Sequence, residues 1–318
     1  MTRTEFCAFL RGHDNFVILT HRRPDGDTIG SAAALCRGLR QLGKTAFVLT
    51  NEQFTPRFGP FLDGLTCDAL PAGATVISAD IASEGLLSFD AVRLQLMPVC
   101  AVDHHGSNSL ACPKLVEADK AACGEIIHAI LLELGAPVSK ETAEALYVAI
   151  STDTGCFKYS NTTSRTHIIA AKLMAYEFDV SGINYKLFDM KSKGRLELEQ
   201  AITQGMEFFC DDRVAVVWLT TELMDRFMGR VDSEDFNGLA SLPRQVEGVI
   251  IGATVKQKGP ATFKISVRTA EPINAGSVCA LFGGGGHARA AGCTIEGSIE
   301  FVKAKLLPVF EKALKANE

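Results

Sequence analysis

Short apolar runs alternate with longer segments of helical periodicity along the first 190 residues of the chain. The apolar runs are five or six residues long and are typical of strands buried on both faces of a sheet. They span residues 16–20, 45–49, 74–78 and 97–102. The segments with helical periodicity span residues 29–42, 121–134, 140–150 and 163–176. Strands that alternate with helices predict a mainly parallel sheet and therefore an α/β fold.

A second alternating system follows after residue 190. Residues 192–209 are predicted to form a long helix with a polar face, and residues 191–212 are interpreted as a helical linker. The elements predicted beyond it are strands at 214–219, 248–255 and 262–268, a glycine-rich loop at 283–286 and a final helix at 299–314. A chain of 318 residues has room for two domains. We therefore expect a metal-binding domain at 1–190 and a smaller α/β domain at 213–318, with the active-site cleft between them.

Carboxylates and histidines gather where the predicted strands of the first domain end. The first run is His21, Asp25 and Asp27, the second is Asp80, the third is Asp103, His104 and His105, and the fourth is Asp153 after a predicted helix. Ligands of open α/β sheets bind outside the carboxyl ends of the strands. Three of the four runs fall at that edge, and together they offer enough oxygen and imidazole groups for two divalent cations.

The first run lies in a Pro-Asp-Gly-Asp turn, where Gly26 relieves the backbone and two carboxylates can point into one space. Hard divalent cations bind such oxygens, and the imidazole of His21 favours Mn²⁺, Fe²⁺, Co²⁺ or Zn²⁺ over Mg²⁺ or Ca²⁺. The alternative is an Asx turn whose acids are solvated. The turn by itself does not decide between the two.

Asp103, His104 and His105 directly follow a buried apolar run. Three adjacent titratable residues there would be costly to desolvate unless they met a metal ion or one another. The alternative is a surface turn with two exposed histidines. Asp80 and Asp153 are weak signals when taken singly, because each could cap a helix or a turn.

Composition limits the classes of partner. Residues 1–190 contain 21 Asp and Glu against 16 Lys and Arg, while the remainder contains 16 of each, so the net charge of −5 comes from the first half. No strongly basic domain is present to bind long nucleic acid by phosphate neutralisation, but a short phosphate ligand is compatible. Ten scattered cysteines without a C-x-x-C pair suit a reducing compartment. Without an apolar leader or a membrane-length apolar stretch, we expect a cytoplasmic protein that does not bind membranes.

The second half has a glycine-rich motif of its own. Gly283 to Gly286 are followed by His287 and Arg289. Four glycines leave backbone N–H groups free to approach an anion, and Arg268 at a strand end can supply a bidentate phosphate contact. The alternative is a flexible hairpin or hinge loop, because glycine-rich loops are not specific.

The ordered motifs resemble one known family. His-x-x-Pro-Asp-Gly-Asp at 21–27, Asp80, Asp-His-His at 103–105, Thr-Asp-Thr-Gly at 152–155 and a distal Gly-Gly-Gly-Gly-His-x-x-Ala-Ala-Gly at 283–292 are similar to those of the DHH phosphoesterase superfamily with its DHH-associated C-terminal domain. The resemblance covers nearly the whole chain. Phe157 to Thr163 also resembles the subfamily of oligoribonucleases (nanoRNases) and pAp phosphatases.

The resemblance implies roles for named residues. Two divalent cations, typically Mn²⁺, would be held by His21, Asp25 and Asp80 on one side and by Asp27, Asp80, His104 and Asp153 on the other, with Asp80 shared. His105 would contact the substrate phosphate or assist proton transfer, and Asp103 would orient the histidines. The residues implied in substrate binding are Arg268, Gly284, Gly285, Gly286 and His287.

The implied activity is hydrolysis of short oligoribonucleotides to mononucleotides and removal of the 3′-phosphate of pAp, through a bridging water activated by two metals. Short RNA or DNA, dinucleotides and pAp are the expected ligands. A cyclic-di-AMP or pApA phosphodiesterase of the same superfamily is the alternative. A non-catalytic nucleotide sensor is more remote, because no metal ligand is missing from the motifs. The sequence leaves open the physiological substrate, the metal bound in the cell, the direction of cleavage and whether the protein is a homodimer.

Overall fold

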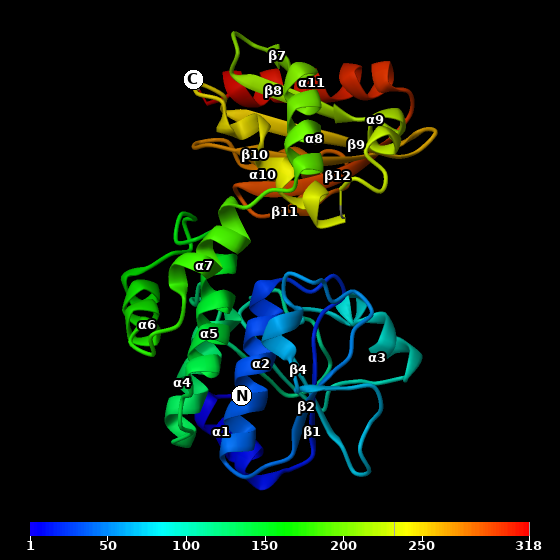
Figure 1. Cartoon of the computed structure of the whole chain (residues 1–318). Helices are drawn as coiled ribbons and strands as arrows, with labels where there is room; N and C mark the ends of the chain where they lie inside the picture. The colour runs from blue at the N-terminus through cyan, green and yellow to red at the C-terminus, as the bar shows by residue number, and fades with distance from the viewer. Residues whose placement is uncertain (232, 318) are drawn as a thin grey trace. The chain divides into compact units, whose positions relative to one another are not determined.

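The computed structural model describes residues 1–231 and 233–317, and the chain divides into two compact units, Met1–Met190 and Lys191–Glu318 (Figure 1). The first unit is built on a six-stranded sheet in the order β3-β2-β1-β4-β5-β6, and every neighbouring pair in it is parallel. Its strands are β1 (Phe16–Leu19), β2 (Ala46–Leu49), β3 (Thr66–Cys67), β4 (Thr75–Ala79), β5 (Cys100–Asp103) and β6 (Lys114–Val116). The order reverses between β1 and β4, so these neighbours form the switch point at which open α/β sheets bind ligands.

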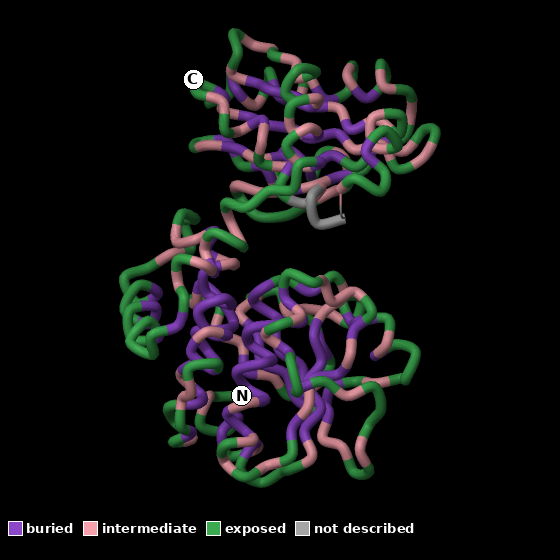
Figure 2. Tube along the Cα trace, in the orientation of Figure 1, coloured by how far each residue is buried: buried purple, intermediate pink, exposed green. Residues whose placement is uncertain are grey.

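Two apolar layers cover the faces of this sheet. Along β1, Phe16 and Ile18 join one buried cluster while Val17 and Leu19 join the other, as the two-residue period of a strand requires. The first layer is formed mainly by α1 (Arg3–Gly12), α2 (Gly26–Gln41), α4 (Cys123–Leu134) and α5 (Lys140–Asp153), and the second includes α3 (Phe89–Arg93). Figure 2 shows the strands and the inner helices as the buried part of the unit. The parallel α/β architecture expected from the apolar runs is confirmed.

The helix predicted at 29–42 begins earlier, at Gly26. The Asp25 side chain accepts hydrogen bonds from the backbone N–H groups of Asp27 and Thr28, so the Pro-Asp-Gly-Asp segment is the N-cap of α2 instead of a separate turn. Asp27 consequently lies in the first helical turn. The segment after α5 continues through α6 (Ser164–Met174), α7 (Val180–Asn184) and a π-helical turn, η3 (Tyr185–Asp189).

The second unit has a mixed six-stranded sheet in the order β11-β12-β10-β9-β8-β7, in which only β8 and β9 are parallel. Its strands are β7 (Glu207–Phe209), β8 (Val214–Leu219), β9 (Ile251–Gly259), β10 (Thr262–Thr269), β11 (Gly285–Gly286) and β12 (Ala290–Glu296). The helices α10 (Ala275–Ala280) and α11 (Ile299–Lys315) belong to the apolar cluster of one face. The sequence prediction missed β12, whose residues alternate between buried and exposed positions.

The segment interpreted as a helical linker has a different structure at its end. Helix α8 (Lys193–Gln204) stops at Gly205, and β7 follows as an edge strand paired with β8. Leu198 and Ile202 are buried against residues of β8 and α9 (Thr221–Arg226), so α8 covers the second face of this sheet.

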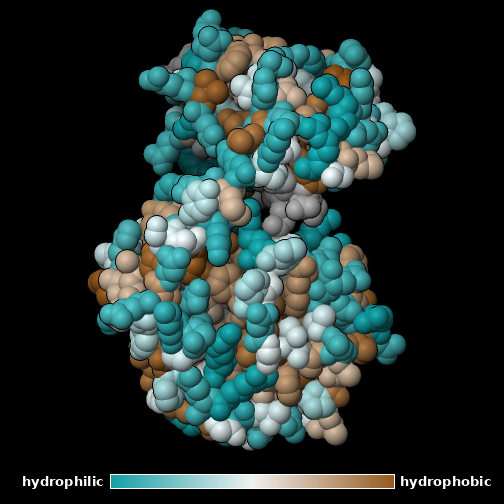
Figure 3. All heavy atoms as spheres, viewed as in Figure 1, coloured by the Kyte–Doolittle hydropathy of each residue, from teal (hydrophilic) through white to brown (hydrophobic). Residues whose placement is uncertain are grey.

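Hydrophobic side chains on the face seen in Figure 3 are scattered among hydrophilic ones in both units. No helix in the described parts of the chain has the length and apolar character that a membrane span needs.

Close packing between α2 and α5 gives a test of the first unit. A Cβ added at Gly30 would lie 2.3 Å from the Ala145 carbonyl oxygen, and a backbone atom cannot yield cheaply. We expect Gly30→Ala to lower the free energy of unfolding by about 1–3 kcal/mol in urea denaturation. Gly12→Ala is the matched control, because no atom lies within 4 Å of its added Cβ. Equal stability of the two variants would contradict this packing.

Candidate metal and active site

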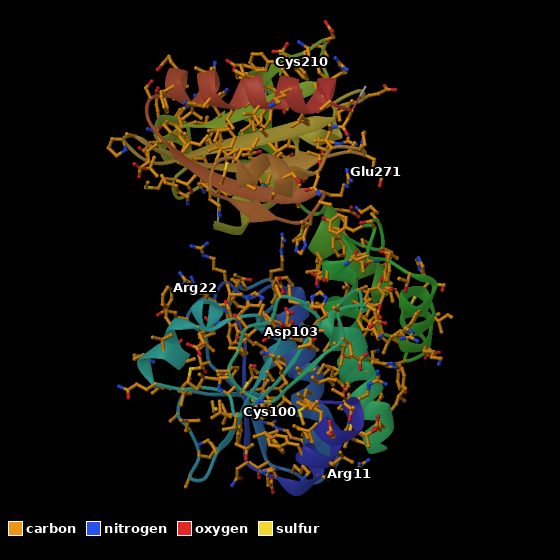
Figure 4. The ribbon with its side chains drawn as sticks, turned by 180° about the vertical axis from the view of Figure 1, so that it is seen from behind. Arg11, Arg22, Cys100, Asp103, Cys210 and Glu271 are labelled. Carbon is orange, nitrogen blue, oxygen red and sulfur yellow. The ribbon has the colours of Figure 1, made fainter. Side chains whose placement is uncertain are left out.

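The acidic and histidine runs meet at the carboxyl edge of the parallel sheet. His21 follows β1, Asp80 follows β4, and Asp103 is the last residue of β5, and these three strands are neighbours around the switch point. Figure 4 shows Asp103 and Arg22 at the same end of the first unit, while Cys100, the first residue of β5, lies deeper. Asp153, the last residue of α5, is brought to the same edge.

Three overlapping groups of potential metal ligands form at this edge, and the third consists of Asp80, Asp103, His104 and His105. In the first, the His21 Nε2 atom lies 3.5 Å from Asp25 Oδ1 and 3.7 Å from Asp80 Oδ2. In the second, the distances run from His104 Nε2 and are 3.8 Å to Asp27 Oδ2, 3.6 Å to Asp80 Oδ1 and 3.5 Å to Asp153 Oδ2. The structure therefore brings all six predicted ligands together, and their assignment to two ions stays a prediction.

Asp80 lies between the first two groups and faces each with a different oxygen. Its backbone has a φ of 61°, a left-handed conformation that a non-glycine residue adopts at some energetic cost. Its side chain is buried, and the ring nitrogens nearest to Oδ1, His105 Nδ1 at 3.4 Å and His104 Nε2 at 3.6 Å, make no well-formed hydrogen bond with it. A buried carboxylate oxygen without a well-formed hydrogen bond is costly, and such an atom is accounted for when a cation binds there.

Asp27 is held by the start of another helix. Its carboxylate accepts hydrogen bonds from the backbone N–H groups of Cys123 (2.7 Å) and Gly124 (3.0 Å) and from the Ser31 hydroxyl (3.0 Å). Helix α4 has no side-chain cap of its own, since Ala122 occupies the N-cap position. Asp27 thus caps α4 from α2 and is fixed in place by doing so, as a carboxylate at a helix N-terminus is stabilised.

Contacts of the Nδ1 atoms of His21 and His104 orient both rings so that Nε2 faces the carboxylates. The Nδ1 atom of His21 lies 2.9 Å from the Arg22 carbonyl oxygen, and that of His104 lies 3.3 Å from the Lys120 carbonyl oxygen. A proton on Nδ1 satisfies these carbonyls and leaves the Nε2 lone pair for a cation. This is the usual arrangement of metal-ligating histidines.

Asp103 is fully buried and organises the loop that carries the histidines. Its Oδ1 accepts hydrogen bonds from the backbone N–H of His104 and from both the backbone N–H and Nδ1 of His105. Its Oδ2 accepts a 2.6 Å hydrogen bond from Asn108, which also bonds to the Ile81 carbonyl. The sequence reasoning missed Asn108, because an asparagine in a polar loop has no distinguishing pattern.

Burial and neighbouring carboxylates raise the pKa values of three acids in this site. They raise the pKa of Asp80 to about 6 and that of Asp153 to about 7, and they raise the pKa of Asp27 well above its usual value. Like charges confined in a partly desolvated space disfavour ionisation. Without a cation, the site therefore retains protons that free carboxyls would lose.

The pKa values of His21 and His105 are raised as well, which favours their protonated, positively charged forms. The hydrogen bond of His105 Nδ1 to Asp103 Oδ1 (2.8 Å) and the Asp80 carboxylate, whose Oδ1 lies 3.4 Å from the same nitrogen, raise the pKa of His105 to about 11. Burial opposes protonation of His21, but the hydrogen bond and charge of Asp25 outweigh it and raise the pKa of His21 to about 9. A divalent cation supplies positive charge that these protons otherwise provide, so the donor set fits divalent metal ions. The mixed imidazole and carboxylate ligands suit first-row transition metals.

The residues predicted to bind substrate in the second unit lie on β10 and on the β11–β12 hairpin. Arg268 pairs with Ala290 across the sheet, and His287 is exposed beside the hairpin turn. The predicted loop is partly strand, because Gly285 and Gly286 form β11. A Cβ at Gly284 would lie 2.2 Å from the Gly292 carbonyl oxygen, so this glycine is explained by the close approach of the strands.

The expectation that all four glycines leave their N–H groups free is wrong for Gly283 and Gly284, and Gly285 and Gly286 pair with β12. Gly283 donates to the Ala280 carbonyl and Gly284 to the Cys279 carbonyl. The hairpin needs these bonds to join the end of α10. The substrate-binding role of Arg268, Gly284, Gly285, Gly286 and His287 stays a prediction.

Comparison with known proteins decides the family. The DHH family N-terminal domain matches residues 15–150, and the DHHA1 domain matches residues 214–316. A bifunctional oligoribonuclease and PAP phosphatase NrnA from Thermus thermophilus is 31% identical over 290 residues, which cover 88% of this chain and 84% of that protein. The chain belongs to the DHH family. As a DHH phosphoesterase it is a hydrolase, which confirms the resemblance stated from the motifs and the expected enzyme class.

Two further proteins are similar to this chain. The Bacillus subtilis protein named bifunctional oligoribonuclease and PAP phosphatase NrnA is 25% identical over 92% of this chain and 93% of its own. A crystal structure of an exopolyphosphatase-related protein from Bacteroides fragilis superposes with a TM-score of 0.84, covers 99% of this chain and 95% of its own, and is 24% identical. That structural likeness supports the fold.

The shifted pKa values predict how metal binding depends on pH. Acids with pKa values raised from 3.8 to about 6 or 7, and His21 raised from 6.5 to about 9, keep more protons in the folded than in the unfolded state. Metal-free protein therefore loses stability at this site as pH rises from 5 to 8. A cation replaces these protons, so Mn²⁺ should raise the melting temperature above its value in EDTA by more at pH 8 than at pH 5. Each kcal/mol by which the stabilisation free energy differs between the two pH values should appear as a difference of about 2–4 °C in that gain.

Differential scanning calorimetry at both pH values, with and without Mn²⁺, measures this gain. Asp80→Asn is the control and should lose most of it. A gain that is equal at the two pH values, or larger at pH 5, would contradict the proposed competition between protons and metal.

Proposed function

We propose that this DHH protein hydrolyses short oligoribonucleotides to mononucleotides and removes the 3′-phosphate of pAp, using two divalent cations that are most simply Mn²⁺. The observation that carries the proposal is Asp80, whose two buried oxygens face two separate ligand groups. A carboxylate shared in this way is the device by which paired-metal phosphoesterases hold their ions close together.

The ligand assignment follows these two groups. His21, Asp25 and Asp80 would hold one ion, and Asp27, Asp80, His104 and Asp153 would hold the other. Cations in such a site make a bound water acidic and neutralise charge on the phosphoryl oxygens. The ten cysteines are free thiols, which supports a location in the reducing cytoplasm.

His105 and Asp103 have different roles in this proposal, because His105 would contact the substrate and Asp103 would orient His105. The Asp103 carboxylate accepts a 2.8 Å hydrogen bond from the Nδ1–H group of His105. This bond fixes the orientation of the ring and favours the protonated form of His105. The His105 side chain is 39% exposed and can therefore reach a substrate, whereas Asp103 is sealed from solvent. His105 would donate a hydrogen bond to a phosphoryl or leaving oxygen, and Asp103 would act through His105.

The proposed substrate class is that for which the most similar relatives are named. Proteins named oligoribonuclease and PAP phosphatase match 88–92% of this chain, and the resemblance at Phe157 to Thr163 points to the same subfamily. Arg268, Gly284, Gly285, Gly286 and His287 would bind the phosphates or the terminal nucleotide. A metal-binding domain at 1–190 and a substrate-binding domain at 213–318 also belong to this proposal.

Two alternatives share the same first unit. A cyclic-di-AMP or pApA phosphodiesterase would use the same metal ligands and differ in the nucleotide that it accepts. A nucleotide sensor would bind its ligand without turnover. Neither has a feature among the described residues that favours it.

Product analysis with purified protein and Mn²⁺ tests the proposal. The substrates are pAp, a diribonucleotide, an RNA of about 24 nucleotides and cyclic-di-AMP, since a site for short ligands should discriminate among them. We expect turnover of pAp and the diribonucleotide, little turnover of the long RNA, and a loss of at least about 100-fold in Asp80→Asn, in which one shared ligand oxygen becomes an amide nitrogen. Circular dichroism would check that the variant is folded.

Each other outcome has a definite meaning. Turnover of cyclic-di-AMP alone would show that the protein is a phosphodiesterase of cyclic dinucleotides instead. Absence of turnover for every substrate, with metal measured in the protein, would favour the sensor. Undiminished activity of Asp80→Asn would refute the shared-carboxylate site.

A further inference from the structure

The segment that follows Asp153 has an uncommon backbone. Gly155, Cys156 and Phe157 have φ values of 56°, 58° and 63°, three consecutive left-handed residues of which two are not glycine. The turn is held by the Cys156 N–H, which donates to the Ser151 carbonyl at 2.7 Å, and by the Phe157 N–H, which donates to the Thr154 hydroxyl. Strained backbone of this kind persists where the surrounding structure enforces it, and it is common at functional sites.

The turn places the ring of Tyr159 on the backbone of Gly155. A Cβ added at Gly155 would lie 2.3–2.6 Å from the ring carbons Cζ, Cε1 and Cε2, so the ring rests where a side chain would otherwise be. Tyr159 is nevertheless 61% exposed, and its hydroxyl has no hydrogen-bond partner among the residues that the structure describes. One side of the ring is therefore seated on the protein while much of the residue faces solvent.

A second tyrosine in the same unit shows the contrast. Tyr147 is 2% exposed, packs against Phe157 and Phe178, and bonds through its hydroxyl to Asn184. Its role is to stabilise the core. Tyr159 has none of these structural contacts, so its position calls for another explanation.

The Tyr159 ring is held close to the metal ligands. Gly155, on which it rests, is two residues from Asp153, and two Cα–Cα steps span at most about 7.6 Å. The Asn161 side chain donates to the Asp153 carbonyl at 3.1 Å and to the Ala121 carbonyl at 3.0 Å. The Thr162 N–H donates to the Tyr159 carbonyl at 3.1 Å. These bonds fix the segment that carries the ring relative to the end of α5.

We infer that Tyr159 is a stacking platform for the nucleobase next to the phosphate held at the metal site, and that it selects nucleotides over base-free phosphate esters. An aromatic ring with one seated and one open side can stack on any base, because every base has a π face. Such stacking requires no base-specific hydrogen bond, which suits an enzyme that acts on short RNA of any sequence. This inference rests on the proposed function and adds the source of its preference for nucleotides.

The test compares Tyr159→Leu, which removes the ring, with Tyr159→Phe, which keeps it. Tyr185→Leu is the matched control, because Tyr185 is also exposed (57%) but lies in η3, outside the Asp153 segment. The substrates are pAp and its abasic counterpart, in which hydrogen replaces adenine. We expect Tyr159→Leu to raise KM for pAp about 10-fold or more, with kcat within about 2-fold. KM for the abasic compound, and both kinetic constants of Tyr159→Phe and Tyr185→Leu, should match the wild type.

Calorimetric binding of AMP and of ribose 5-phosphate to the Mn²⁺-loaded proteins supplies a readout without turnover. Tyr159→Leu should bind AMP about 10-fold more weakly and ribose 5-phosphate equally well. Unchanged AMP affinity and unchanged KM for pAp would overturn the inference, as would equal losses for the compounds with and without a base. The wild type could turn over no nucleotide while its affinity for AMP still depends on the Tyr159 ring. That result would refute the proposed hydrolase function and support the stacking role of Tyr159.

Discussion

Mutual repulsion of carboxylates at one edge of a parallel sheet is the constraint on which the first unit depends. Five of them meet there, and burial with like charge raises the pKa values of three: Asp27, Asp80 and Asp153. The fold satisfies Asp27 with the N-terminus of α4 and Asp103 with the His104–Asn108 loop. Among the described residues it gives Asp80 Oδ1 no well-formed hydrogen bond, although His105 Nδ1 lies 3.4 Å away. The charge that remains is what a divalent cation neutralises.

The topology explains why these groups meet. Strands β1, β4 and β5 are neighbours, so three sequence segments more than twenty residues apart end side by side. Gly30 allows α2 to approach α5 closely, which brings Asp153 to the same edge. Each ligand therefore comes from the end of a regular element that packing holds in place. Rigid support of this kind is what an active site needs, because small displacements of ligands weaken catalysis.

Much of the first unit was predictable from the sequence because its signals are local. Continuous apolar runs identified four strands, and the ordered motifs with His21, Asp80, His104 and Asp153 identified side chains that the fold brings together. The rest depends on contacts across the fold. Nothing local shows that Asp27 caps a helix almost one hundred residues away, or that Asn108 supports Asp103. The short strands β3, β6 and β11 were missed because two or three residues carry no periodicity.

The most direct test of the account is electron paramagnetic resonance of the protein loaded with Mn²⁺. If Asp80 joins two ions, the spectrum of the wild type should show two exchange-coupled Mn²⁺ ions per chain. Asp80→Asn should lose that coupling, because the shared carboxylate is gone. A spectrum of isolated, uncoupled Mn²⁺ in the fully loaded wild type would contradict the shared site, and the role given to Asp80 with it.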